Sequence, residues 1–257
     1  MKLIMQTANN TILITGGGSG IGRELALRFH DLGNTVIVTG RRASLLQETI
    51  DGRQNMHAFE LDIDDPKAIN AFAQRIVTEY PSVNVLINNA GIMRYEDLST
   101  RSDLCDAQAQ ITTNVLGPIR LTNAFIDHLK SQQNSAIVNV SSGLAFVPRA
   151  DAAVYSATKA AVHFYTVSLR HQLVDQVEVI ELVPPGIQTE LTPGQSDREG
   201  YMPLNAYIDE VITLFCKQPT PNEIVVERAQ LQRLAEREGR FEQVFDLINA
   251  RATEQRR

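Results

Sequence analysis

The strongest constraint on the fold is a regular alternation along the chain between short runs of β-branched residues and longer amphipathic stretches. Seven runs have the composition of strands, at residues 11–15, 35–39, 56–60, 83–88, 136–141, 177–183 and 223–227. The stretches between them are long enough for right-handed crossover helices, which join parallel strands. We therefore expect an α/β fold, with a doubly wound, parallel, seven-stranded sheet and helices on both faces.

The length and hydrophobic content of the chain suggest one globular domain, and its net charge limits the partners it could bind. A chain of 257 residues with 43% hydrophobic residues suits a single core, and we assign residues 1–228 to it. Residues 191–203, rich in glycine, proline and charge, read as a loop over the site, and residues 229–257 as a charged helical tail. The net charge of −6 argues against general affinity for nucleic acid or an anionic membrane.

Cysteine and histidine usage argues against a metal site. Cys105 and Cys216 form no CxxC pair, and the five histidines show no spacing typical of metal ligands. Unpaired cysteines favour a reducing compartment. Residues 1–10 are too short and too polar for a signal peptide, and no run of 18 apolar residues occurs. We expect a cytoplasmic protein without a membrane segment.

A glycine-rich loop joins the first predicted strand to a helical pattern that continues to Leu32. Residues 16–22 read Gly-Gly-Gly-Ser-Gly-Ile-Gly. Glycines let the backbone approach a pyrophosphate, and the helix N-terminus behind them offers free N–H groups and a positive dipole. A plain glycine turn is the alternative. The strand–turn–helix context favours a dinucleotide site of the Rossmann type.

Six motifs, in order and over roughly residues 11–190, resemble those of the short-chain dehydrogenase/reductase family. They are Thr15-Gly16-x3-Gly20-x-Gly22, Asp62, Asn88-Asn89-Ala90-Gly91, Asn114, Ser142 and Tyr155-x3-Lys159. Segments 10–17, 141–148 and 179–185 also resemble one bacterial branch, the DltE-like oxidoreductases. The resemblance implies a single-domain oxidoreductase that transfers a hydride between a nicotinamide cofactor and a small carbonyl or alcohol substrate.

The resemblance also assigns the cofactor contacts. They are Gly16, Ser19, Gly20, Ile21, Gly22, Asp62, Ile63, Asn89, Gly91, Ile187 and Thr189, together with Tyr155 and Lys159. The family usually has Pro-Gly-x-(Val/Ile)-x-Thr after the sixth strand. Residues 184–189 read Pro-Pro-Gly-Ile-Gln-Thr, so Pro185 lies where that glycine normally lies, while Ile187 and Thr189 fit.

The end of the second strand favours NADP(H) over NAD(H). An acidic residue there would bind the adenosine ribose and repel a 2′-phosphate, but the chain has Thr39 and Gly40 in that region. Arg41 follows and offers a planar cation for the phosphate. The alternative is that Arg41 and Arg42 are solvated residues at the start of a helix, and NAD(H) stays possible.

Tyr155 and Lys159 are the predicted centre of catalysis. They stand four residues apart in a helical pattern over residues 152–174, so they share one helix face. A phenol ordinarily titrates near pH ~10; a nearby ammonium lowers its pKa, whereas desolvation raises it. The resemblance gives Tyr155 the acid/base role and Lys159 a contact with the nicotinamide ribose.

Ser142 and Asn114 complete the predicted catalytic set. Ser142 would hydrogen-bond the substrate oxygen, while Ser141, the competing candidate, would close a turn at the strand end. Asn114 lies in a helical pattern over residues 103–130, and Pro118 removes the amide that its carbonyl would bind, so we expect a kink. The freed carbonyl would hold a water that relays protons to Lys159. A kink without function is the alternative.

The substrate itself is not defined by these motifs. Pocket candidates are Met93, Arg94, Leu144, Phe146, Arg149 and residues 191–203. Arg94 or Arg149 would attract an acidic substrate, although surface arginines are more common, and Leu144 and Phe146 suggest a lipophilic body. We interpret the chain as an NADP(H)-dependent carbonyl reductase or alcohol dehydrogenase. The alternative is a non-catalytic, cofactor-sensing regulator, although such proteins commonly lose the tyrosine or the lysine.

The segment 152–169 predicts self-association, because apolar or small residues cover nearly every face of its helix. Burial against a second subunit explains that excess, with residues 103–126 as the companion helix. The resemblance also implies homodimers or homotetramers. Apolar tail residues at helical spacing would join the interface; they are Leu231, Leu234, Phe241, Val244, Phe245 and Ile248, interrupted by Gly239.

Overall fold

The seven predicted runs form seven parallel strands of one sheet in the computed structural model, which describes residues 5–254. The strands are β1 (Thr11–Thr15), β2 (Thr35–Gly40), β3 (Met56–Glu60), β4 (Val83–Asn88), β5 (Ala136–Val140), β6 (Glu178–Val183) and β7 (Glu223–Val225). Their order is β3-β2-β1-β4-β5-β6-β7. The doubly wound parallel sheet predicted from the sequence is confirmed, with strand ends displaced by at most two residues.

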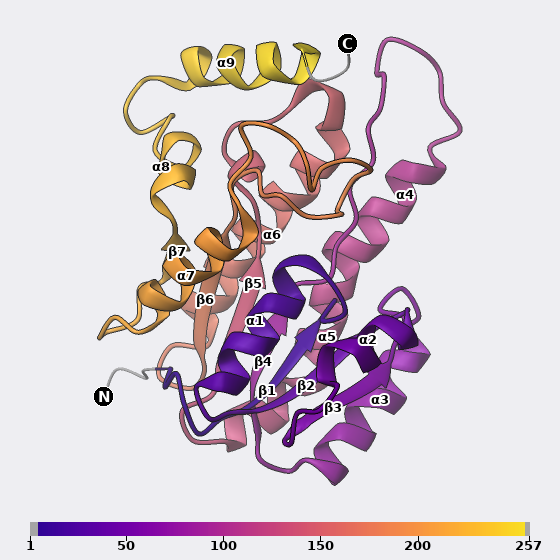
Figure 1. Ribbon diagram of the computed structural model, residues 1–257, viewed down its shortest axis with the longest axis vertical. Helices are drawn as coiled ribbons and strands as arrows, with labels where there is room; N and C mark the ends of the chain where they lie inside the picture. Colours follow the sequence, from indigo (N-terminus) through magenta and orange to yellow (C-terminus); the bar gives the residue numbers. More distant parts are fainter. Residues whose placement is uncertain (1–4, 255–257) are drawn as a thin grey trace.

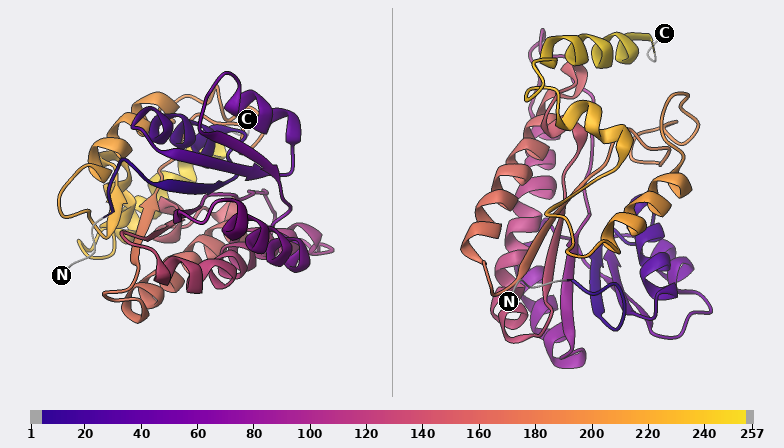
Figure 2. Two further views of the ribbon diagram at one scale, coloured as in Figure 1. Left: turned by 90° about the horizontal axis from the view of Figure 1, so that it is seen from below. Right: turned by 90° about the vertical axis from the view of Figure 1, so that its left-hand side faces the viewer.

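Helices cover both faces of the sheet (Figures 1 and 2). One face carries α1 (Gly20–Asp31), α2 (Ala43–Ile50) and α7 (Leu204–Phe215); the other carries α3 (Pro66–Glu79), α5 (Gly117–Ser131) and α6 (Ala153–Gln172). Alternate residues of β1 enter different cores, since Ile12 and Ile14 pack with the first set and Leu13 with the second. Burial on both faces explains why the strands read as continuous apolar runs.

The strand order reverses beside β1, which pairs with β2 on one side and with β4 on the other. The loops that follow β1 and β4 therefore meet at the carboxyl edge of the sheet, where open α/β folds bind ligands. Thr15 joins the two loops, because its hydroxyl accepts hydrogen bonds from the backbone N–H groups of Asn89 and Ala90, both at 3.0 Å.

The predicted kink near Asn114 takes the form of a π-helical turn, η1 (Thr112–Leu116), between α4 (Cys105–Ile111) and α5. Pro118 is one of the first two residues of α5. A missing amide at this position disturbs the regular ladder of helical hydrogen bonds, so the deviation has an identifiable cause.

The tail forms two helices, α8 (Glu227–Arg233) and α9 (Phe241–Glu254), and its residues 255–257 lie outside the described part. Val244 is 1% exposed and packs against Val147 and Ala235, with Phe241, Phe245 and Ile248 around this cluster. The expectation that Val244 joins a subunit interface is therefore wrong, because its own chain covers it. Among the described residues, no helix is both long enough and apolar enough to span a membrane.

Candidate active site

The glycine loop adopts the conformation that a tight turn into a helix requires. Gly16 and Gly20 have φ angles of +68° and +54°, in the left-handed region that favours glycine. Ser19 is the N-cap of α1, but its hydroxyl forms no capping hydrogen bond to the helix. The first backbone N–H groups of α1 are therefore available to an anionic ligand.

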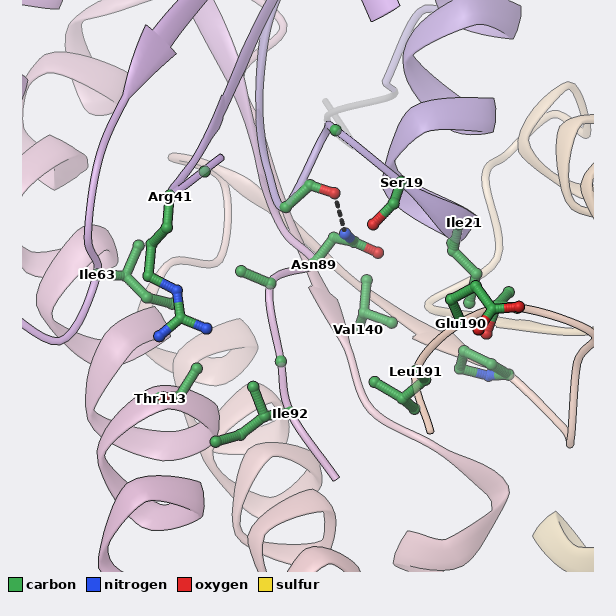
Figure 3. Close-up of a pocket in the computed structure, with 18 of the residues that line it drawn as sticks. Ser19, Ile21, Arg41, Ile63, Asn89, Ile92, Thr113, Val140, Glu190 and Leu191 are labelled. Carbon is green, nitrogen blue, oxygen red and sulfur yellow. Dashed lines mark hydrogen bonds between the residues drawn. The ribbon is translucent and has the colours of Figure 1, made fainter. Parts of the chain in front are cut away.

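A cavity of about 420 Å³ extends from this loop along the carboxyl edge of the sheet (Figure 3). Most of the predicted cofactor residues line it: Gly16, Ser19, Gly20, Ile21, Arg41, Asp62, Ile63, Asn89, Gly91, Tyr155, Lys159, Ile187 and Thr189. Gly22 is not in the lining and packs behind the loop, against the Gly16 carbonyl. The structure thus gathers at one cavity residues that are up to 173 positions apart, from Gly16 to Thr189.

Arg41 and Arg42 both lie at the end of the cavity beside β2. The Arg41 side chain extends into the cavity in Figure 3. The guanidinium of Arg42 donates a hydrogen bond of 3.1 Å to the Ser19 hydroxyl, which connects it to the glycine loop. From the sequence we expected only Arg41 to face the cofactor, and Arg42 was named only as a solvated residue. The two adjacent arginines in the sequence could have suggested a second cation at this site.

Tyr155 lies at the other end of the cavity and is only 7% exposed. Burial raises the pKa of its phenol well above the ordinary value, and a hydrogen bond with Ser142 offsets part of that rise. Of the two opposing effects expected from the sequence, burial dominates. Tyr155 therefore holds its proton at neutral pH.

Lys159 lies one helical turn beyond Tyr155 on α6, with Nζ 5.6 Å from the centre of the Tyr155 ring. Its Nζ donates a hydrogen bond of 2.8 Å to the Val140 carbonyl at the end of β5. Burial lowers the pKa of Lys159 to about 8, because water no longer solvates the ammonium. Among the described residues no carboxylate forms an ion pair with it.

Asn114 holds the loop after β4 through its side chain. Its Nδ2 donates to the Ile92 carbonyl at 2.8 Å, and its Oδ1 accepts from the Ile92 N–H at 2.9 Å. Nδ2 also donates to the Thr158 hydroxyl at 3.1 Å, which ties the loop to α6. From the sequence we expected a role only for the Asn114 carbonyl, so these side-chain contacts were not predicted.

Gly91 is the point at which Asn114 and Lys159 approach each other. A Cβ at this position would lie 3.2 Å from Asn114 Oδ1 and 3.6 Å from Lys159 Nζ. A Cβ here would therefore press against Asn114 Oδ1, whereas its distance to Lys159 Nζ is an ordinary contact, so glycine gives the Asn114 side chain room. Asn114 lies outside the cavity lining, whereas Lys159 belongs to it.

The turn at the end of β5 is closed by Ser142 and not, as expected, by Ser141. Ser141 does not close the turn; its hydroxyl donates to Glu181 Oε1 at 2.5 Å, inside the protein. Ser142 closes the turn, because its Oγ accepts the Leu144 N–H at 3.1 Å. It also bonds to Tyr155. The expectation for Ser141 is therefore wrong, because the buried Glu181 carboxylate provides a stronger partner.

The candidate substrate residues divide between the site and its surroundings. Met93 and Leu144 pack beside Tyr155, and Arg94 lines the cavity. Phe146 was wrongly expected to line the pocket: its ring instead packs against His163, at 4.7 Å between centres. Arg149 is not a surface charge either, because it is buried and paired with Asp151 at 2.8 Å.

The segment after β6 approaches the catalytic end of the cavity despite the displaced glycine. Ile187 is buried and bridges to Met202, and the Thr189 hydroxyl accepts a hydrogen bond of 3.2 Å from Gln195. Gln195 therefore connects this segment to the loop of residues 191–203, which folds back over it.

Comparison with known proteins agrees with this geometry. The family described as short chain dehydrogenase matches residues 10–200. The uncharacterized oxidoreductase DltE of Bacillus subtilis (strain 168) is 40% identical over 250 residues, which cover 95% of this chain and 98% of DltE. The NADP-dependent 3-hydroxy acid dehydrogenase of Schizosaccharomyces pombe (strain 972) is 31% identical over 189 residues, 71% of this chain and 73% of that enzyme.

A solved structure has the same fold over almost the whole chain. A short chain dehydrogenase from Burkholderia cenocepacia J2315, in complex with NADP, is 26% identical to this chain with a TM-score of 0.79. The match covers 95% of this chain and 98% of that one. Sequence motifs, sheet order and relatives agree, and the chain is a member of the short-chain dehydrogenase/reductase family of oxidoreductases, in its DltE-like branch.

Proposed function

We propose that this protein is an NADP(H)-dependent oxidoreductase that transfers a hydride between nicotinamide and a carbonyl or secondary alcohol, with Tyr155 as general acid and base. The observation that carries the proposal is the convergence of Tyr155, Ser142 and Lys159 at one end of a cavity that begins at a glycine loop. A proton donor and an anion cradle thus share one cavity, as the reaction requires.

The residues present fit a nicotinamide dinucleotide. Gly16 and Gly20 open a cradle at the N-terminus of α1, and the Ser19 hydroxyl is free of a capping bond, so the pyrophosphate would lie there. Ile187 and Thr189 would hold the nicotinamide end, and Lys159 the ribose beside it. The bound cofactor supplies or accepts the hydride.

The protein residues manage the proton. In reduction, the Tyr155 hydroxyl donates its proton to the substrate oxygen, which Ser142 also contacts as charge develops on it. In oxidation, Tyr155 takes that proton back, and the Lys159 ammonium stabilises the phenolate. Asn114 acts through the loop after β4, which it holds against α6 beside Lys159. Asn114 is therefore a positioning residue.

The cations beside β2 support a preference for NADP(H). Arg41 and Arg42 line the cavity where an acidic residue would select NAD(H), and Arg42 already bonds to Ser19. A guanidinium binds a phosphate through two parallel hydrogen bonds. The relative from Schizosaccharomyces pombe is named as NADP-dependent, and the structure from Burkholderia cenocepacia contains NADP.

The exposed apolar residues of the central helices support a homodimer or homotetramer. Phe164 and Val167 on α6 are 69% and 42% exposed, and Ile111 and Leu116 lie exposed on the α4–η1 segment. Water exposure of a large aromatic ring costs free energy that a subunit interface would recover.

The exposed, unpaired Cys105 and Cys216 suit a reducing cytoplasm.

The direct test is NADPH oxidation with a panel of aldehydes, ketones and diketones, followed by absorbance. We expect turnover of at least one compound, and the reverse reaction with NADP⁺ and the corresponding alcohol. Binding of NADPH in a calorimeter without turnover of any compound in either direction would contradict the enzymatic function and favour a cofactor-sensing regulator.

A further inference from the structure

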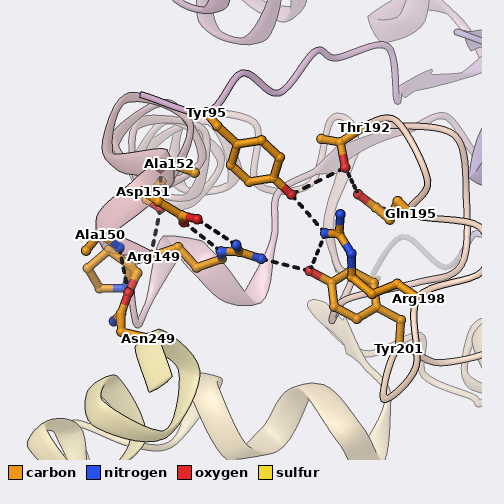
Figure 4. A network of polar contacts seen from close by, with 12 residues as sticks. Tyr95, Arg149, Ala150, Asp151, Ala152, Thr192, Gln195, Arg198, Tyr201 and Asn249 are labelled. Atoms are coloured by element: carbon orange, nitrogen blue, oxygen red, sulfur yellow. Dashed lines mark hydrogen bonds and ion pairs between the residues drawn. The ribbon is translucent and has the colours of Figure 1, made fainter. Parts of the chain in front are cut away.

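Two arginines and two tyrosines form a polar network beside the catalytic tyrosine (Figure 4). Arg198, in the loop of residues 191–203, donates through Nη1 to the Tyr95 hydroxyl at 2.9 Å and to the Tyr201 hydroxyl at 3.4 Å. Arg149 donates through Nη1 to the same Tyr201 hydroxyl at 2.9 Å. Two guanidinium groups therefore converge on one phenolic oxygen, from segments 49 residues apart.

Positive charge in this network exceeds the negative charge that balances it. Asp151 pairs with Arg149, with contacts of 2.9 and 2.8 Å to its guanidinium. Arg198 is partly buried, and among the described residues it forms no ion pair with a carboxylate; its guanidinium donates to the phenol oxygens of Tyr95 and Tyr201. The pKa of Tyr95 agrees with a positive field: burial raises it, but hydrogen bonds from Thr192 and Arg198 and the charges of Arg149 and Arg198 lower it overall.

The excess charge lies next to the reacting end of the cavity. Tyr95 belongs to the small apolar cluster that also contains Tyr155, Met93 and Leu191. The Tyr201 ring packs against Gly186, where a Cβ would lie 3.2 Å from the ring, just before the segment that would hold the nicotinamide.

Neutral phenols are weak partners for a partly buried guanidinium. A carboxylate in their place forms charge-assisted bonds that are about twice as strong, and the planar fork of arginine matches its two oxygens. An anionic group entering from the cavity would replace the contacts of Arg198 to Tyr95 and Tyr201, while Arg149 keeps Asp151. The two hydroxyls would remain as donors to the same anion.

We propose that Arg198, with the hydroxyls of Tyr95 and Tyr201, recognises a carboxylate on the substrate, so that the preferred substrates are oxo acids or the corresponding hydroxy acids. This inference rests on the proposed oxidoreductase function and adds the chemical class of the substrate. It differs from the sequence expectation of Arg94 or Arg149, because Arg149 is committed to Asp151 and Arg94 pairs with Asp106 at 3.6 Å, whereas Arg198 has only phenol acceptors.

The kinetic test compares each oxo acid with its methyl ester, for 2-, 3- and 4-oxo acids, with NADPH as reductant. We expect the ratio of kcat/KM for acid over ester to exceed about 10 for at least one chain length, as one charge-assisted interaction contributes. Arg198→Met should lower that ratio to about 1, mainly through KM, and Arg198→Lys should lower it less. Arg75→Met, on the exposed surface of α3, should keep the ratio of the original protein.

A binding test separates this inference from the enzymatic proposal. Saturated acids and their methyl esters, which have no carbonyl to reduce, are titrated calorimetrically into the NADPH complex of the original protein and of Arg198→Met. Tighter binding of the acid that disappears in Arg198→Met supports the inference even where no compound is turned over. Equal affinity for acid and ester, or a preference that Arg198→Met retains while Arg94→Met abolishes it, would overturn the assignment to Arg198.

Discussion

The Lys159 ammonium is buried at the cost of its hydration, and this makes its contribution to the stability of the protein depend on pH. Its pKa falls from 10.5 to about 8, so the unfolded chain binds this proton more tightly than the folded protein does. The penalty is therefore complete below about pH 8 and disappears as the pH rises through 10.5. Part of it is offset by the bond to the Val140 carbonyl.

We therefore expect Lys159→Met to raise the free energy of unfolding at pH 7 by roughly 1–3 kcal/mol, although the variant should lose activity. At pH 10 the gain should be smaller, because the lysine is then mostly neutral in the folded protein. Urea unfolding of the protein without added cofactor, at both pH values, measures the two differences. A variant that is less stable than the original protein at pH 7, or a gain that is equal at both values, would show that burial of this charge is not costly.

Arg41 provides a second prediction at this scale, on cofactor choice. NADPH should bind at least about tenfold more tightly than NADH, which corresponds to about 1.4 kcal/mol. Arg41→Ala should weaken NADPH binding and leave NADH binding almost unchanged, because only NADPH carries the 2′-phosphate. Calorimetric titration gives both constants, with Arg53→Ala, at a distant exposed ion pair, as the control. Equal loss for both cofactors would remove Arg41 from the phosphate site.

The spacing of residue types in the sequence predicted which residues form the site. It did not predict which hydrogen bonds their side chains form. Tyr155, Lys159 and the glycine loop could be identified because each depends on a local pattern, a helical turn or a strand–turn–helix. Ser141 could not, because its partner Glu181 is 40 residues away on the next strand. The side-chain bonds of Asn114 to Ile92 were equally hidden, since they span 22 residues.

At the scale of elements, α9 stabilises the segment that carries Arg149. Asn249 on α9 accepts the Ala150 N–H at 2.7 Å and donates to the Pro148 carbonyl at 3.3 Å. Val244, on the buried side of the same helix, packs against Val147. The tail is therefore joined to the preceding part of the chain next to the network proposed for substrate recognition.

We expect Val244→Asp to lower the free energy of unfolding by at least about 2 kcal/mol, because it places a carboxylate in an apolar cluster without a partner. Gln243→Asp, at the exposed neighbouring position on the same helix, is the matched control and should change stability by less than about 0.5 kcal/mol. Chemical denaturation measures both. Similar stability of the two variants would mean that α9 is not docked as described.

The ends of helices and strands were predicted correctly where the composition of the sequence changes sharply. They were predicted less well where the pattern of backbone hydrogen bonds sets the boundary. Strand β1 has its predicted bounds, and Gly239, with a φ angle of +66°, separates α8 from α9 where the apolar pattern is interrupted. The predicted helix over residues 103–130 instead begins at Cys105 and contains the π-helical turn. The position of Pro118 predicted a deviation, but not its type, which depends on how neighbouring turns share their carbonyls.

At the scale of the whole molecule, self-association is the main prediction. Phe164→Glu places a charge at the most exposed large aromatic side chain of α6, and we expect it to shift the protein from a dimer or tetramer to the 28.5 kDa monomer. Gln74→Glu, at an exposed position of α3, adds the same charge and should leave the mass unchanged. Light scattering at micromolar concentration measures both. A monomer mass for the original protein would refute the subunit interface.

The topology of the molecule was predictable because alternating strands and helices leave few ways to connect them. The network around Arg198 was not, because its contacts join residues 95 and 198, and 149 and 201, which only the folded sheet brings together. Sequence position suggested Arg94 or Arg149 as a ligand for an acid, with a surface charge as the more common alternative. The structure commits Arg149 to Asp151 instead.

The central claim is that Tyr155 moves the proton in a hydride-transfer reaction, and Tyr155→Phe tests it most directly. The change removes one hydroxyl from a buried ring, so the fold and NADPH binding should persist. Turnover of the best carbonyl substrate, measured by NADPH oxidation at saturating cofactor, should fall by about 100-fold or more. A Tyr155→Phe protein that binds NADPH and turns over substrate at the rate of the original protein would contradict the mechanism.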